Sequence, residues 1–260
     1  MNNNNIYVGM DVHNSNFTLC SFNPINETFF AEIAIEPDYK KVIKYVERLK
    51  TEYKDVNFVL GYEAGSLGYS LYRQLTDKEY NCVILAPSTM AKSPKDASKK
   101  TDKRDARTIA KCLAFGLYKA VYVPDEIDNE VKEYIRCRDD IKAELKRTKQ
   151  ELLAFLLRHG YIYTETKNKW TPSFFAWLNK LTMSAKLKEV LDEYLEEYRR
   201  LSDKIERMDN TIYEEAHSDR YEERVKKLIC LKGIKEHTAL SFLVEVGDFS
   251  RLRPDRKSVV

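Results

Sequence analysis

The order of short apolar runs in the first third of the chain restricts its fold more than any other feature. Three runs rich in β-branched and aromatic residues come first, separated by the turn-forming segments HNS and NPINE, and they lie at residues 6–12, 16–22 and 28–35. This pattern predicts three consecutive antiparallel strands joined by tight turns. Helical and strand patterns then alternate, at residues 37–53, 57–63, 67–75 and 81–86. A meander followed by alternating helices and strands predicts a mixed α/β sheet.

One more helix and a short strand complete the predicted domain. A polar, basic loop at 88–100 precedes a helix from about 103 to 115, which Gly116 closes. We expect a short strand at 120–123, before Pro124. Three antiparallel strands followed by helix, strand, helix and strand is the order of the ribonuclease-H-like (RuvC-like) nucleases. The predicted fold class is therefore an α/β ribonuclease-H-like domain, by analogy of element order.

Composition excludes several classes of protein. The net charge of the 260 residues is only +3, from 44 Lys and Arg against 41 Asp and Glu. Attraction to nucleic acid must therefore come from local clustering, which occurs between Lys92 and Lys111. The five cysteines form no CxxC pair and no zinc-finger spacing, which argues against a disulfide framework and a structural zinc. No apolar stretch is long enough to span a bilayer, so we expect a soluble cytoplasmic protein without a membrane partner.

Two long helical patterns follow the predicted α/β domain. In the first, between residues 127 and 155, apolar residues recur at spacings of four and three, and Arg138 and Thr148 are polar interruptions. The second covers 187–212, and residues 160–184 connect the two. We predict an antiparallel helical hairpin, a coiled-coil arm. Such an arm can close on itself, but we expect it to join a second chain, with Arg138 and Thr148 setting the register, into a homodimer or homotetramer.

The last block, residues 228–252, has the pattern of a helix, a Lys-Gly-Ile turn and a second helix. Gly233 lets backbone amides approach a phosphate in helix-hairpin-helix contacts with DNA, so Lys232 and Gly233 are candidate nucleic-acid contacts. A plain helical turn explains the pattern equally well. The predicted domains are 1–123 for the α/β body, 124–220 for the arm and 221–260 for a partial helix-hairpin-helix domain.

Four carboxylates come from segments that are far apart in the sequence and that this fold would bring close together. Asp11 lies near the end of the first predicted strand, Glu63 ends the fourth, and Asp102 and Asp105 lie at the start of the last helix. In a ribonuclease-H-like sheet the first and fourth strands are neighbours and the last helix crosses them, so these side chains converge. Repulsion disfavours such a group without cations, and hard oxygen ligands select Mg²⁺ or Mn²⁺. We predict two ions, which position a nucleophile and stabilise charge on a scissile phosphate.

Basic residues surround Asp102 and Asp105. The candidate contacts to a nucleic-acid backbone are Lys95, Lys99, Lys100, Lys103, Arg104 and Arg107. Pairing of Arg104 and Arg107 with acids of the same helix is the alternative. His13 follows the first strand in the segment DVHNSN and is either a ligand of a metal or phosphate or a solvated turn residue.

Four segments resemble one family, and the resemblance covers essentially all of residues 6–122. They are GMDVHNSNFTL, LGYEAGSLGYSL, ILAPSTMAKSPK and KKTDKRDARTIAKCLAFG. They resemble the DEDD-type insertion-sequence transposases, the group that contains the pilin-gene invertase and the bridge-RNA-guided recombinases. KGIKEHTALSFLVEVGDFSRL is similar to the start of that family's C-terminal transposase domain.

The resemblance implies a bacterial DNA recombinase that cleaves and exchanges strands with the help of a metal. It implies a catalytic and metal-binding tetrad of Asp11, Glu63, Asp102 and Asp105 and a requirement for Mg²⁺. It also implies a coiled-coil arm, assembly into dimers and tetramers, and, for some members, a structured guide RNA.

One element of the family pattern is missing from this sequence. In the family, the C-terminal domain continues to a Ser-Gly-containing stretch whose serine attacks DNA. Here the sequence ends at RPDRKSVV, and neither Ser241 nor Ser258 matches that stretch, so we assign no catalytic serine and expect a truncated form. The alternatives are a stand-alone metal-dependent nuclease or Holliday-junction resolvase, and a non-catalytic nucleic-acid-binding remnant. A sugar or acetate kinase of the actin-like fold ranks last, because we find no glycine-rich phosphate loop.

Overall fold

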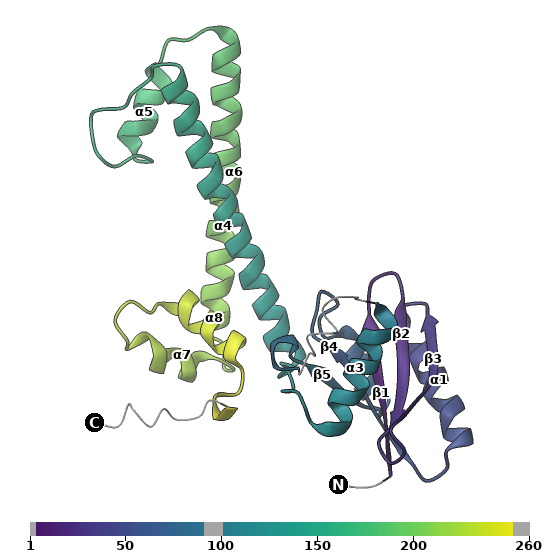
Figure 1. Ribbon diagram of the computed structural model, residues 1–260. Coiled ribbons are helices and arrows are strands. Elements are labelled where there is room, and N and C mark those ends of the chain that lie inside the picture. The colour runs from purple at the N-terminus through teal and green to yellow at the C-terminus, as the bar shows by residue number, and fades with distance from the viewer. Residues whose placement is uncertain (1–3, 91–100, 252–260) are drawn as a thin grey trace. The chain divides into compact units, whose positions relative to one another are not determined.

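The chain divides into two compact units. The computed structural model describes residues 4–90 and 101–251, and the units are Met1–Val123 and Pro124–Val260. The first unit contains a sheet with helices, and the second is helical (Figure 1). Within the described ranges, no helix is both long enough and apolar enough to cross a membrane.

The first unit is built on a mixed sheet of five strands. The strands are β1 (Asn5–Val12), β2 (Phe17–Asn23), β3 (Thr28–Ile35), β4 (Asn57–Glu63) and β5 (Asn81–Leu85). They lie in the order β3-β2-β1-β4-β5 (Figure 1). Strand β2 pairs antiparallel with β1 and β3, whereas β4 runs parallel to β1 and β5. This confirms the predicted meander and the mixed α/β sheet, with the fourth strand beside the first, as in a ribonuclease-H-like domain.

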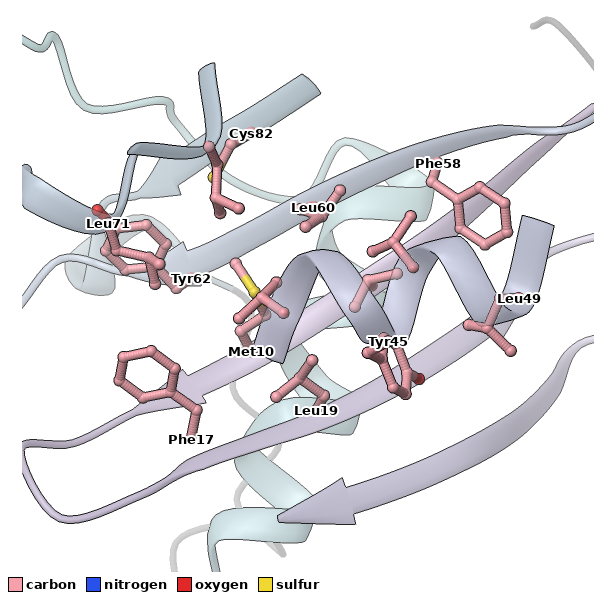
Figure 2. Close-up of a cluster of buried hydrophobic side chains, with 14 of the residues drawn as sticks. Met10, Phe17, Leu19, Tyr45, Leu49, Phe58, Leu60, Tyr62, Leu71 and Cys82 are labelled. Carbon is pink, nitrogen blue, oxygen red and sulfur yellow. The ribbon is translucent and has the colours of Figure 1, made fainter. Parts of the chain in front are cut away.

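Helices cover both faces of the sheet. Helices α1 (Tyr39–Glu52) and α2 (Ser70–Thr76) share the larger core with one face, and α3 (Asp102–Phe115) packs against β1, β2 and β4 on the other. A short 3₁₀ helix (Pro87–Thr89) follows β5. Figure 2 shows Met10 and Leu60 of the sheet on the same side as Tyr45 and Leu49 of α1. The apolar residues at helical spacing in α1 and at every second position in the strands therefore meet in one core.

Helix α3 lies directly against the backbone of β1, because residue 9 has no side chain. A Cβ atom added at Gly9 would lie 2.1 Å from the Ala106 carbonyl oxygen and 2.4 Å from the Ala110 nitrogen. Both of these atoms belong to the backbone of α3, so a small rotamer change cannot relieve the clash. The helix begins after Thr101, whose side chain accepts a hydrogen bond from the Arg104 N–H. Gly9 therefore sets how closely the first turns of α3 approach the sheet.

The predicted strand at 120–123 is wrong. Ala120 makes a single antiparallel bridge with Leu85, and the Val121 N–H donates a hydrogen bond of 2.8 Å to the Ile84 carbonyl. The segment therefore touches the edge of β5 without running along it. Pro124 follows closely and has no N–H with which to extend the pairing.

The second unit is built around two long helices. These are α4 (Glu126–Arg158) and α6 (Ala185–Ala216), which pack against each other and run in opposite directions (Figure 1). Helix α5 (Pro172–Lys180) shares an apolar cluster with one end of this pair. At the other end, α7 (Glu222–Ile229) and α8 (Glu236–Val246) share a second cluster with α4 and α6, and a 3₁₀ turn (Phe249–Arg251) follows.

The predicted seam of α4 is buried at Leu152 and Phe155, but its first part, which the spacing assigns to Ile127, Val131 and Tyr134, is not the buried face. Ile127 and Tyr134 are 50% and 37% exposed, whereas the neighbouring Ile135 is only 3% exposed. Ile135 packs with Ile212 of α6 and Tyr221 in the cluster that α7 and α8 complete. Because α8 contacts both long helices at this end, the buried face of α4 is turned toward it. Heptad spacing within α4 contains no information about that third helix.

The two polar interruptions of the seam are satisfied within the chain. Arg138 is buried, and its Nε and Nη2 atoms donate to the two carboxylate oxygens of Asp209 on α6 at 2.6 and 2.9 Å. The Thr148 hydroxyl donates to the Glu144 carbonyl at 3.2 Å. This ion pair therefore links α4 to α6 in a single chain.

A methyl group at position 9 should separate α3 from β1. We expect Gly9→Ala to lower the free energy of unfolding of the first unit by about 3 kcal/mol, because the new atom meets backbone that cannot move aside. Chemical denaturation followed by circular dichroism measures this change. Gly65→Ala is the matched control, since a Cβ there meets only the Glu63 carbonyl at 3.9 Å. Equal stability of the two variants would contradict the proposed contact.

Candidate metal centre

Two of the predicted carboxylates lie at or next to the ends of neighbouring strands. Strands β1 and β4 run parallel with Met10 opposite Tyr62, so the residues that follow, Asp11 and Glu63, lie at the same edge of the sheet. Met10 and Tyr62 belong to the core on the α1 face. Since successive side chains of a strand point to opposite faces, Asp11 and Glu63 point to the face that α3 covers. Both are partly buried.

The other two carboxylates arrive on the first turns of α3. Asp102 and Asp105 are three residues apart on α3, and they lie four residues before the buried Ala106 and the buried Ile109 respectively. Asp102 is exposed and Asp105 is partly buried. The close packing of α3 on Gly9 therefore places these acids beside the end of β1.

The structure brings Asp11, His13 and Asp102 together most closely. One oxygen of each carboxylate and one ring nitrogen of His13 all lie within 4.8 Å of one another. Asp105 and Glu63 are not part of this closest group. The charge of Asp105 nevertheless acts on Asp11, and Glu63 occupies the same sheet edge.

The electrostatics of Asp11 reflect this crowding. Burial raises the pKa of the Asp11 carboxyl, and the negative charges of Asp105 and Asp102 raise it further. His13 acts in the opposite direction, with its Nε2 atom 3.3 Å from Asp11 Oδ2. Oxygen and imidazole donors that converge on one point fit a divalent cation, which would remove the repulsion among the carboxylates.

The basic residues of α3 have different surroundings. Lys103 and Arg104 are exposed on the first turn. The Arg107 guanidinium instead binds Glu32 of β3, with Nη2 3.0 Å from Oε2, and its carbon lies 5.5 Å from the centre of the Phe29 ring. This pairing lowers the pKa of Glu32. Lys95, Lys99 and Lys100 lie outside the described residues.

The remaining predicted contacts belong to the second unit. Lys232 and Gly233 are exposed in the turn between α7 and α8, and Gly233 has a left-handed φ of 91°. Ser241 lies inside α8, and Ser258 lies outside the described residues. Lys232 and Gly233 remain predicted contacts.

His13 is not one of the four predicted carboxylates, and the sequence leaves it open between a ligand and a solvated turn residue. The signal for it is its place in the sequence, two residues after Asp11 at the start of the turn that follows β1. The His13 N–H donates to the Asn16 carbonyl at 3.0 Å, which closes the turn after β1 and keeps the ring next to Asp11.

Comparison with known proteins identifies the family. Residues 8–160 match the DEDD transposase family of the IS110 type, described as "Transposase". The chain is also 34% identical over 253 residues to the "Transposase for insertion sequence element IS1533" of Leptospira borgpetersenii, an alignment that covers 96% of this chain and 72% of that protein. The chain belongs to the IS110-type DEDD transposase family. This confirms the resemblance to insertion-sequence transposases that was inferred from the sequence motifs.

Two further similarities are weaker. A protein of Sinorhizobium fredii (strain NBRC 101917 / NGR234) named "Putative transposase y4qE" is 28% identical over 223 residues, which are 86% of this chain and 53% of that protein. The solved structure titled "T. thermophilus RuvC in complex with Holliday junction substrate" has a TM-score of 0.31 and 8% identity, and covers 45% of this chain and 99% of that one. A likeness of this size supports no conclusion about function.

Removal of the Asp11 charge should stabilise the protein when no metal is present. The pKa of Asp11 is raised in the folded state, so the ionised carboxylate destabilises the folded protein. This cost appears as the pH rises above the ordinary aspartate pKa and is complete above the raised pKa of the folded state. We expect Asp11→Asn to raise the melting temperature at pH 7 in chelator. The gain should disappear as the pH falls below the ordinary aspartate pKa of about 3.9.

Melting curves of wild type and variant at several pH values measure this effect. Asp77→Asn, at the exposed end of α2, is the matched control and should show no such gain. A lower melting temperature for Asp11→Asn at pH 7 in chelator would contradict the electrostatic cost.

Proposed function

We propose that the first unit is the DEDD nuclease domain of a transposase and cleaves DNA strands with the help of divalent cations. The observation that carries this proposal is the convergence of Asp11 and Asp102, with Asp105 close by, inside the region that matches the family. Glu63 completes the set from the adjacent strand. Mg²⁺ or Mn²⁺, as two ions, is the cofactor that this donor set fits.

The proposed role of each residue of the site follows from its position in the fold. Asp11 and Glu63 hold their carboxylates on the rigid edge of the sheet, and Asp102 and Asp105 supply theirs from α3. Bound cations would supply charge neutralisation at a scissile phosphate and activation of the attacking oxygen. Lys103 and Arg104, exposed on the outer side of the first turn, lie where they can bind neighbouring phosphates. Half-burial of Asp11 limits the competition of water for its oxygens.

The whole transposase would use this chemistry in strand exchange on DNA, with or without a guide RNA. The chain spans 72% of the IS1533 transposase and 53% of the Sinorhizobium relative. We assign residues 124–220 to an arm and 221–260 to the start of a helix-hairpin-helix domain. In that domain Lys232 and Gly233 would contact a phosphate, because both are exposed in the turn and Gly233 has the left-handed φ of 91° that turns approaching an anion can use.

Loss of the carboxylates should abolish metal-dependent cleavage. We expect the full chain to bind Mg²⁺ or Mn²⁺ and to cut labelled duplex or branched DNA. Asp102→Asn and Glu63→Gln should each slow cleavage by about 10²–10³-fold, because they remove stabilisation of charge at the phosphate. Titration calorimetry measures metal binding, and gel assays measure cleavage.

Asp77→Asn is the control and should behave as wild type. Cleavage that is equal in all variants would refute the proposal. DNA binding that is sensitive to salt but never accompanied by cleavage would instead identify a binding protein without catalysis.

We further propose that α4 joins two copies of this chain. Ile127, Val131 and Tyr134 lie along one side of α4 in the predicted seam, and all three remain partly or largely exposed. An apolar stripe at heptad spacing is suited to a second helix of the same kind. The arm would then make a homodimer, or a homotetramer of two such pairs.

Substitution of the stripe should separate the copies. Light scattering of wild type at increasing concentration should give the mass of a dimer or tetramer, and the double variant Ile127→Ser with Tyr134→Ser should shift it toward the monomer. Leu157→Ser, an exposed apolar residue near the other end of α4, should leave the mass unchanged. A wild-type monomer at every concentration would exclude the proposed association.

A further inference from the structure

His13 is the least expected member of the acidic site. Its Nε2 atom lies 3.3 Å from Asp11 Oδ2. One ring nitrogen of His13 and one carboxylate oxygen each of Asp11 and Asp102 lie within 4.8 Å of one another. A nitrogen donor therefore lies among the oxygens that come from β1 and α3. The ring is 48% exposed, so little desolvation opposes a change of partner.

The turn after β1 holds the ring in this place. Asp11 lies near the end of β1, and His13 is the first residue after this strand, with a ring nitrogen near a carboxylate oxygen of Asp102 on α3. The backbone hydrogen bond from the His13 N–H to the Asn16 carbonyl fixes the start of the turn. The nitrogen therefore reaches the site by backbone geometry.

A nitrogen donor changes which cation a site prefers. Mg²⁺ is a hard ion that binds oxygen ligands and keeps several waters. Imidazole suits the first-row transition ions better, whereas sites made only of carboxylates and water suit Mg²⁺. A site with carboxylates and one imidazole is therefore less selective for Mg²⁺ than a site with carboxylates alone.

We infer that His13 is a ligand of the cation held by Asp11 and Asp102, and that it shifts the preference of this site from Mg²⁺ toward Mn²⁺. The inference rests on the proposed metal-dependent function and adds a residue outside the four carboxylates. The simpler role for His13, a hydrogen bond to Asp11, predicts no nitrogen at the metal. The two roles therefore differ in a direct spectroscopic property.

Paramagnetic Mn²⁺ bound to the full chain provides the test. We expect electron spin-echo envelope modulation to show a nitrogen coupled to Mn²⁺ in wild type and not in His13→Gln. Removal of this donor should weaken Mn²⁺ binding by about tenfold or more, at least the effect of losing a partner of a metal ligand. Mg²⁺ binding should change much less. Titration calorimetry with each ion alone measures both affinities.

Two control variants separate His13 from other sources of signal. His159→Ala removes an exposed histidine of the second unit, and Asn14→Ala alters the same turn without removing a histidine. Both should keep the nitrogen signal and the Mn²⁺ affinity of wild type. Persistence of the nitrogen signal in His13→Gln would overturn the inference, because another histidine would then be the source.

The outcomes also separate this inference from the proposed function. Tight Mn²⁺ binding without any nitrogen coupling, sensitive to Asp102→Asn, would exclude His13 as a ligand and leave the carboxylate site intact. Failure of wild type to bind either Mn²⁺ or Mg²⁺ would overturn both. Equal losses of Mg²⁺ and Mn²⁺ affinity in His13→Gln would refute the shift in preference.

Discussion

The contact between the backbone of α3 and the backbone of β1 is the constraint on which the rest of the site depends. Gly9 is the position where the Ala106 carbonyl and the Ala110 amide nitrogen come too close for any side chain. With the helix this close to the sheet, its first turns lie beside the end of β1, where Asp11 lies two residues after Gly9. The distance between acids from distant parts of the sequence is therefore set by the absence of one side chain.

Carboxylates gathered in this way reduce stability unless something compensates for their repulsion. The raised pKa of Asp11 is the local sign of that cost. The beginning of α3 provides partial compensation, because the free N–H groups of a helix start favour negative side chains in its first turn. The core beneath the site, with Val8 and Met10 fully buried on the opposite face, maintains the geometry. Functional sites often retain such local costs, which the surrounding fold offsets.

The sequence predicted the features that depend on period and on local turn residues. The strands β1 to β5 and the placement of the four acids on β1, β4 and α3 followed from alternation and element order. The features that the sequence did not predict depend on residues far apart in the chain. Ile135, rather than Tyr134, is buried because α7 and α8 pack against that end of α4. Residues 120–123 carry a strand-like composition, but only one bridge to β5 is formed. His13 stays open between two roles in the sequence because it follows β1 in a turn, where strand alternation does not fix the direction of its side chain.

The acidic and the basic side chains at the start of α3 point in different directions. The acids lie toward the side of the helix that packs on the sheet, since Asp102 is four residues before the buried Ala106 and Asp105 is four residues before the buried Ile109. Arg107 points toward β3, where Glu32 binds it, and the charge of Lys103 also acts on Glu32. Intrahelical pairing, the ordinary explanation of such a segment, is therefore not what this arginine does. Because the Arg107–Glu32 pair joins α3 to a strand two places away from β1, it supports the helix from a second side. Gly9 determines how close α3 comes to the sheet, and Arg107 restrains how the helix turns about that contact.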